Sequence, residues 1–188
     1  MPLAVAREEP ISVEDYLAAE RVSEIRHEYV GGVVYAMAGA SKDHVQIALN
    51  IYSFFRGALR GGPCRAFVTD LKVQLKWKGE DVFYYPDVVI GCDRRDTRPE
   101  LLTYPKLVVE VLSDSTQRLD RWEKRLAYQG IETLQEYLLV AQDRLEATLF
   151  RRANNWDPEV FAQLKQKVPL ESLGLKLSLT AIYEGVLA

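Results

Sequence analysis

The stretch that decides the fold is residues 106–115, KLVVEVLSDS. Apolar residues surround a single glutamate, Glu110, and the run stops at Ser-Asp-Ser. A short apolar run bounded by turn residues is typical of a strand that is buried on both faces of a sheet. An ionised carboxylate inside such a strand costs roughly several kcal/mol unless a partner compensates it. The sequence therefore predicts that Glu110 meets a cation, either a basic side chain or a metal ion.

The length and composition are those of one globular domain. The chain has 188 residues, of which 48% are hydrophobic and 27% charged, so we expect a single domain over residues 1–188. The formal net charge of −3 argues against tight, non-specific binding to nucleic acid, which needs a basic surface. Cys64 and Cys92 are too few for a disulfide framework and lack zinc-site spacing, so we expect a reducing, cytoplasmic setting. We expect no signal peptide and no membrane span, because no apolar run is long enough.

Helix and strand signals alternate along the chain. Ser12 begins a capping box, Gly31-Gly32 marks a hairpin, and Ser41 opens a long helix that Gly61 ends. The predicted helices are residues 12–20, 41–60 and 116–130, with a last helical turn near Ala181. The predicted strands are residues 26–30, 33–38, 65–68, 71–77, 82–90, 106–112, 136–141, 145–151, 159–164 and 175–179, with a surface loop over 91–104. This order predicts an α+β (mixed α/β) fold in which a mixed sheet is covered by at least two helices.

A second carboxylate lies in another strand-like run. Asp87 follows Pro86 in YYPDVVI, residues 84–90, and the proline interrupts the hydrogen-bond ladder there. If the strands of Asp87 and Glu110 are neighbours, both carboxylates can contact one cation. Carboxylate oxygens suit Mg²⁺, and Mn²⁺ accepts the same ligands. A metal ion held in this way polarises a phosphate and activates a water, as a phosphodiesterase requires.

The predicted helix after Glu110 supplies a lysine. Lys124 lies beside the apolar face that Leu119, Trp122 and Leu126 form at helical spacing. From there it can point toward the end of the Glu110 strand, where it would position or activate the water or stabilise charge on the phosphate. Three arginines give this helix a basic side, which either binds phosphate or is simply solvated: Arg118, Arg121 and Arg125.

These residues resemble those of a known family. The matching segments are YYPDVVIGCD (84–93), residues 105–140 from PKLVVEVLSDS to LQEYLLV, and HEYVGGVVYAMAGAS (27–41) with the following His44. Together they are similar to the Uma2 family, which is described as a family of restriction endonucleases and placed in the PD-(D/E)XK nuclease superfamily. The combination of PD, E-V-L-S and a later E-K in a strand-loop-strand-helix order is fairly specific, whereas PD alone is not.

The resemblance implies a restriction-endonuclease-like domain, a central mixed sheet flanked by helices, with Asp87 and Glu110 as metal ligands. The superfamily pattern would place a lysine at position 112, where this sequence departs from it with Leu112. The resemblance implies that Lys124, on the next predicted helix, takes the place of that lysine. Glu28 resembles an extra acidic position of such sites. The implied activity is hydrolysis of DNA by a Mg²⁺-dependent endonuclease, for which a symmetric homodimer would cut both strands.

Other interpretations stay open at this stage. Glu110 can instead be held by an arginine in a non-catalytic member of the fold that binds nucleic acid or protein. A structural dimerisation module with a vestigial site is a third possibility. His44 is a possible accessory residue that contacts substrate, although it and His27 can be structural. Glu28 can simply be a charge partner within its hairpin.

Overall fold

Two mixed β-sheets form the body of the molecule. The computed structural model describes residues 10–112 and 118–186. One sheet has the order β2 (Val33–Ala36), β1 (His27–Val30), β5 (Glu80–Tyr84), β4 (Lys72–Trp77), β7 (Leu101–Leu102). The other has the order β11 (Pro158–Phe161), β10 (Ala147–Arg151), β9 (Glu136–Ala141), β8 (Pro105–Leu112), β6 (Val88–Gly91), β3 (Arg65–Val68). β12 (Lys167–Leu170) and β13 (Leu175–Ser178) form a separate pair. The α+β class predicted from the sequence is confirmed.

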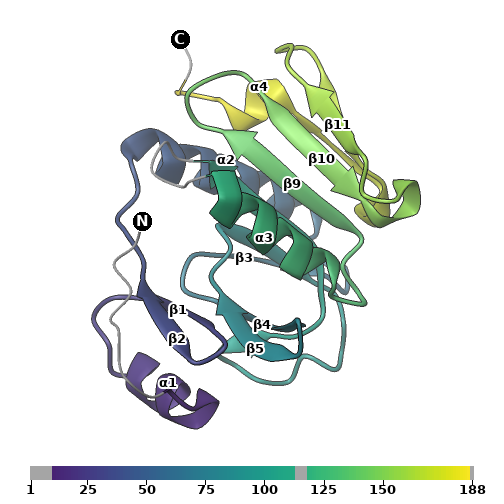
Figure 1. Cartoon of the computed structure of the whole chain (residues 1–188). Helices are drawn as coiled ribbons and strands as arrows, with labels where there is room; N and C mark the ends of the chain where they lie inside the picture. The colour runs from purple at the N-terminus through teal and green to yellow at the C-terminus, as the bar shows by residue number, and fades with distance from the viewer. Residues whose placement is uncertain (1–9, 113–117, 187–188) are drawn as a thin grey trace.

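Four α-helices in the described part of the chain pack around the two sheets. They are α1 (Val13–Glu20), α2 (Lys42–Ala58), α3 (Arg118–Gln129) and α4 (Leu179–Ile182), with short 3₁₀ turns at Arg152–Asn154 and Glu171–Leu173. Figure 1 shows α3 across the front, α2 behind the sheet, and α1 beside the β1–β2 hairpin. Ser12 and Ser41 are the N-caps of α1 and α2, as predicted, because each hydroxyl accepts a backbone N–H three residues on.

Strand β8 separates two hydrophobic cores, as its apolar run predicts. Leu107, Val109 and Val111 pack on the side of α2, whereas Val108 packs on the side of α3. Since side chains alternate along a strand, Glu110 lies on the α3 side with Val108. β8 pairs antiparallel with β6 and parallel with β9, so it lies inside the sheet, and a carboxylate there needs a partner from α3.

The strand predicted over residues 82–90 is wrong as a single element. β5 ends at Tyr84 in one sheet and β6 begins at Val88 in the other. Pro86 has no N–H to give to a ladder, so the chain leaves one sheet and enters the other through Tyr85-Pro86-Asp87. The sequence also missed β7, within the predicted loop, and β12.

The predicted apolar face of α3 is partly wrong. Of the three residues predicted to form it, Trp122 is exposed, Leu126 is partly buried, and the side chain of Leu119 lies outside the described part of the chain. Ala127 and Tyr128 are buried instead. Arg125 is also buried, with its guanidinium over the rings of Trp122 and Phe150, so it is neither a solvated nor a free phosphate-binding group. The predicted helix start at residue 116 and the side chains of Arg118 and Arg121 lie outside the described part of the chain.

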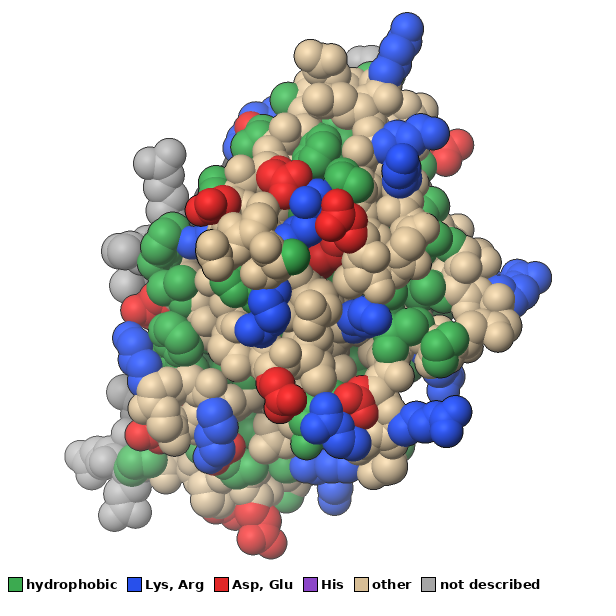
Figure 2. Space-filling model, turned by 90° about the vertical axis from the view of Figure 1, so that its right-hand side faces the viewer, with side chains coloured by type: hydrophobic (Ala, Val, Ile, Leu, Met, Phe, Trp, Pro, Cys, Tyr) green, Lys and Arg blue, Asp and Glu red, His purple; other side chains and the backbone are tan. Residues whose placement is uncertain are grey.

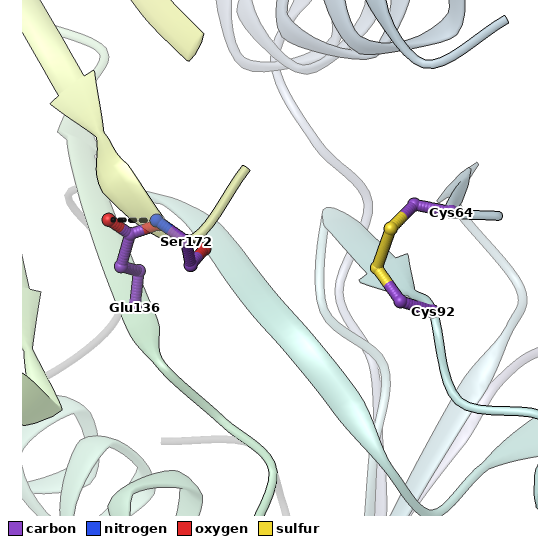
Figure 3. The surroundings of a disulfide bond; sticks show 4 residues. All are labelled: Cys64, Cys92, Glu136 and Ser172. Atoms are coloured by element: carbon purple, nitrogen blue, oxygen red, sulfur yellow. Dashed lines mark hydrogen bonds between the residues drawn. A yellow bond between two sulfur atoms is a disulfide. The ribbon is translucent and has the colours of Figure 1, made fainter. Parts of the chain in front are cut away.

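The two cysteines form a disulfide, a pairing that the sequence analysis did not predict (Figure 3). Cys64 precedes β3 and Cys92 follows β6, and these strands are antiparallel neighbours with Arg65 opposite Gly91. The strand register therefore brings the cysteines together, and their Cα atoms lie 4.1 Å apart. The bond is evidence against the expected reducing setting. Among the described residues, no helix is both long and apolar enough to cross a membrane.

Candidate active site

Asp87 and Glu110 lie next to each other where the two sheets meet. Val88 on β6 pairs with Val109 on β8. The same antiparallel register, continued by one position, places Asp87 opposite Glu110. The condition set by the sequence analysis, that the two strands be neighbours, is therefore met.

Asp87 is held by both of its carboxylate oxygens. Oδ2 accepts the backbone N–H of Val111 at 2.7 Å, and Oδ1 lies 2.8 Å from Nε2 of His44 on the first turn of α2. Burial acts to lower the pKa of His44, but the hydrogen bond and the charge of Asp87 outweigh it and raise that pKa. His44 is thus brought into the group by its contact with Asp87, and this contact fixes the direction of the carboxylate.

Lys124 joins the two sheets through Glu28 and Glu110. Its Nζ atom lies 2.7 Å from Glu28 Oε1 on β1 and 3.2 Å from Glu110 Oε1 on β8, the latter without hydrogen-bond geometry. The ring of Tyr84 lies beneath the ammonium, 5.0 Å away. The structure therefore brings together all five candidate residues of the sequence analysis, in one group around the β5–β6 connection.

Burial and charge set the protonation of this group. Glu110 has a side chain only 12% exposed, and desolvation, with the charges of Asp87 and Glu28, raises its pKa to about 7 against the lowering effect of Lys124. For Lys124, burial favours the neutral amine, but the charges of Glu110 and Glu28 outweigh it and hold the pKa well above its ordinary value. Lys124 is therefore an ammonium at neutral pH, suited to stabilising negative charge and unsuited to accepting a proton.

The oxygen atoms present suit a hard divalent cation. Glu110 Oε1 is buried and, within the described residues, makes no hydrogen bond. Its charge is compensated by the Lys124 ammonium 3.2 Å away, and its lone pairs are free to coordinate a metal ion as well. No group of three or more histidine, cysteine, aspartate or glutamate side chains in the described part of the chain is arranged to hold a metal. Asp87 and Glu110 are thus a pair of neighbouring carboxylates, and Mg²⁺ is commonly bound by one or two carboxylates together with several waters.

The sequence analysis missed the tyrosines that precede Pro86. Tyr84 packs under Lys124, and the backbone N–H of Tyr85 donates to Glu28 Oε1 at 3.3 Å. Their position directly before the PD motif was the available signal.

Comparison with known proteins identifies the family. The Uma2 family model, described as "Putative restriction endonuclease", matches residues 13–181. The chain belongs to the Uma2 family.

Relatives of this Uma2 protein match about three quarters or more of its length. An uncharacterised protein of Synechocystis sp. is 37% identical over 178 residues, which cover 94% of this chain and 93% of that protein. A second uncharacterised Synechocystis protein is 29% identical over 144 residues, which cover 74% of this chain and 80% of that protein. A crystal structure from Anabaena variabilis, described as a "putative nuclease" belonging to DUF820, superposes with a TM-score of 0.76 at 20% identity and covers 95% of this chain and 100% of that one. At this identity the superposition shows a shared, nuclease-like fold.

In this Uma2 protein Leu112 stands where the superfamily pattern has a lysine, and a lysine reaches Glu110 from another element instead. Leu112 ends β8 two residues after Glu110, where the superfamily lysine would lie. The ammonium of Lys124 instead reaches Glu110 from α3. The cation is thus supplied from the helix that packs on this face of the sheet.

Proposed function

We propose that this Uma2 protein is a Mg²⁺-dependent endonuclease that hydrolyses phosphodiester bonds of DNA, with Mn²⁺ able to replace Mg²⁺. The observation that supports the proposal is the meeting of Asp87, Glu110 and Lys124 at one point of the structure. Asp87 and Glu110 would hold the metal ion. Glu28 would be an accessory acidic residue, through its contact with Lys124.

The metal ion, when bound, would polarise the phosphate and lower the pKa of a bound water. The residues of the chain have separate tasks. The backbone N–H of Val111 and the imidazole of His44 fix the direction of the Asp87 carboxylate. The Lys124 ammonium lies beside Glu110 and would stabilise charge that develops on the phosphate.

A cleavage assay with a binding measurement tests this proposal. Supercoiled plasmid is incubated with Mg²⁺ or Mn²⁺ and the wild type, Asp87→Asn, Glu110→Gln or Lys124→Met. The control Asp143→Asn changes an exposed carboxylate paired with Arg144. We expect nicking by wild type and control, a loss of at least about a hundredfold in the three site variants, and a metal-induced rise in melting temperature that Asp87→Asn and Glu110→Gln lose. Equal cutting by all variants would reject the site.

Oligomeric state and location are part of the same proposal. Cleavage of both strands of a duplex would favour a symmetric homodimer, which light scattering after size exclusion would detect. We also propose a cytoplasmic location, where DNA is available. The Cys64–Cys92 disulfide is the observation against that location, and thiol labelling in intact cells tests it.

A second candidate is a non-catalytic member of the family. One observation favours it: Lys124 already gives the buried Glu110 a cationic partner, in the place where the sequence analysis considered an arginine. The charge distribution on one face also gives no sign of a duplex-binding surface, because acidic and basic side chains are interspersed among the described residues that Figure 2 shows. Absence of calorimetric binding of Mg²⁺ and Mn²⁺ at millimolar concentration would favour this candidate.

A further inference from the structure

A small cavity opens directly beside Asp87 and His44. It has a volume of about 190 Å³, and both residues are among those that line it. Its other lining residues come from α2, from the segments before β1 and before α2, from β3 and the turn after it, and from the β5–β6 connection. None of the activities discussed so far uses this space.

One side of the cavity is apolar and partly exposed to solvent. Met37, Val45 and Leu49 line the cavity and are 40%, 46% and 44% exposed. Val45 and Leu49 are four residues apart on α2, so they lie one above the other on the same side of the helix. Exposed apolar side chains gathered around a hollow are typical of a binding site.

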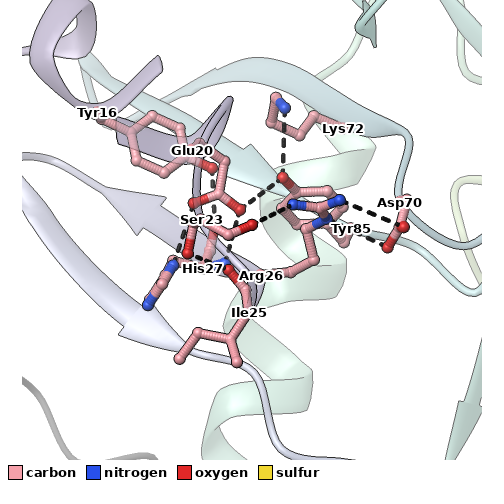
Figure 4. Close-up of polar contacts among 9 residues, drawn as sticks. All are labelled: Tyr16, Glu20, Ser23, Ile25, Arg26, His27, Asp70, Lys72 and Tyr85. Atoms are coloured by element: carbon pink, nitrogen blue, oxygen red, sulfur yellow. Dashed lines mark hydrogen bonds and ion pairs between the residues drawn. The ribbon is translucent and has the colours of Figure 1, made fainter. Parts of the chain in front are cut away.

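The opposite wall carries polar groups. Arg26 and Asp70 line the cavity and form an ion pair of 3.3 Å between Nε and Oδ1, with both side chains solvent-accessible. Figure 4 shows Arg26 between Asp70 and the backbone of Ser23. A guanidinium can stack on a planar ring, and a carboxylate can accept a hydrogen bond from an exocyclic amine.

The floor of the cavity is held in place by a buried network. The Tyr85 hydroxyl donates to Glu20 Oε1 at 2.8 Å and accepts from Lys72 Nζ at 3.3 Å (Figure 4). All three residues are buried. The Tyr85-Pro86-Asp87 segment is thereby fixed to α1 and β4, so the cavity is preformed next to the carboxylate of Asp87.

We infer that this cavity receives one unstacked nucleobase of the strand that is cut, a conclusion that rests on the proposed nuclease function. A phosphate placed at Asp87 and Glu110 brings the neighbouring nucleotide to the mouth of the cavity, because Asp87 is both a proposed metal ligand and a lining residue of the cavity. The volume is below that of a typical drug-sized pocket, which is about 300 Å³ or more, so it suits a single ring system better than a peptide segment. Enzymes that modify a base show that a protein pocket can hold an extruded base between aromatic and apolar side chains.

The test compares a nucleotide with its base-free counterpart. Deoxyadenosine monophosphate and 2-deoxyribose 5-phosphate are titrated in Mg²⁺ against the wild type, Leu49→Trp, which fills the cavity, and Val160→Trp. Val160 is an exposed apolar residue on β11 and does not line the cavity, so it is the control. We expect the nucleotide to bind the wild type and the control about tenfold more tightly than the sugar phosphate, as stacking of one base predicts. Leu49→Trp should abolish this difference and leave sugar-phosphate affinity unchanged.

The outcomes separate this inference from the proposed function. Equal affinity of wild type for both compounds, with binding that Glu110→Gln abolishes, would overturn the base site and leave the metal site standing. Absence of Mg²⁺-dependent binding of either compound would overturn both. A changed oligomeric state of Leu49→Trp, with base preference retained, would show an interface between copies and also overturn the base site.

Discussion

Removing the charge of Lys124 should destabilise the metal-free protein by leaving two buried carboxylates together. Lys124 Nζ lies 2.7 Å from Glu28 Oε1 and 3.2 Å from Glu110 Oε1, with side chains 21%, 21% and 12% exposed. At an effective dielectric constant of about 20 each attraction is roughly 5 to 6 kcal/mol, and desolvation of the ammonium offsets much of it. We expect Lys124→Met to lower the free energy of unfolding by about 3 kcal/mol, the usual cost of breaking a buried pair.

A second substitution should recover much of that loss. Glu110→Gln in the Lys124→Met background leaves Glu28 as the one remaining charge of the three, so we expect a coupling free energy of about 2 kcal/mol. Urea denaturation in EDTA, followed by circular dichroism, measures both variants and each single substitution. Lys76→Met is the control, because this lysine pairs with Asp81 on an exposed surface, where such pairs contribute about 0.2 to 1 kcal/mol. Equal losses for Lys124→Met and Lys76→Met, or additive effects in the double variant, would refute the reasoning.

Three other variants test the disulfide, the buried network of Tyr85 and a buried glutamate. Replacing Cys64 and Cys92 by serine should lower the free energy of unfolding by about 3 kcal/mol relative to the oxidised wild type, because the disulfide joins positions 28 residues apart; denaturation with and without reductant measures this. Tyr85→Phe removes a hydroxyl between two buried charged groups and should cost about 2 kcal/mol, measured by urea denaturation, whereas no loss would mean that the network adds no stability. Burial raises the pKa of Glu136 above its ordinary value, so the stability that its protonated form contributes is present in acid and is lost as pH rises through the raised pKa. Glu136→Gln should therefore flatten the dependence of the melting temperature on pH, measured by thermal unfolding. An unchanged pH dependence would contradict this reasoning.

Much of the fold could be predicted from local patterns. Serine N-caps, the Gly31-Gly32 hairpin and the apolar run of β8 each depend on neighbouring residues alone. The two glycines have φ angles of +53° and +92°, a conformation that glycine adopts at little cost. The helix that carries Lys124 was also predicted from local periodicity, but its buried face was predicted only in part, because packing against β4 and β9 decides which side is covered.

Pairing between distant segments could not be predicted in the same way. Residues 82–90 have one continuous strand-like pattern, yet they belong to two sheets, because Pro86 interrupts the ladder and hydrogen-bond partners come from elsewhere in the chain. The disulfide likewise depends on the register between β3 and β6. Neither the choice of partner strand nor its register is encoded in a local window.

For the candidate site, the sequence by itself predicted five candidate residues, which the structure brings into one group: Asp87, Glu110, Lys124, Glu28 and His44. It could not decide whether the cation beside Glu110 was a metal, an arginine or a lysine. Tertiary structure alone placed the ammonium of Lys124 between carboxylates of two different sheets and His44 against Asp87. The physical reason is that residue type fixes what a side chain can bind, whereas packing of separate elements fixes its distance from a partner and its exposure to water, and these set charge and pKa.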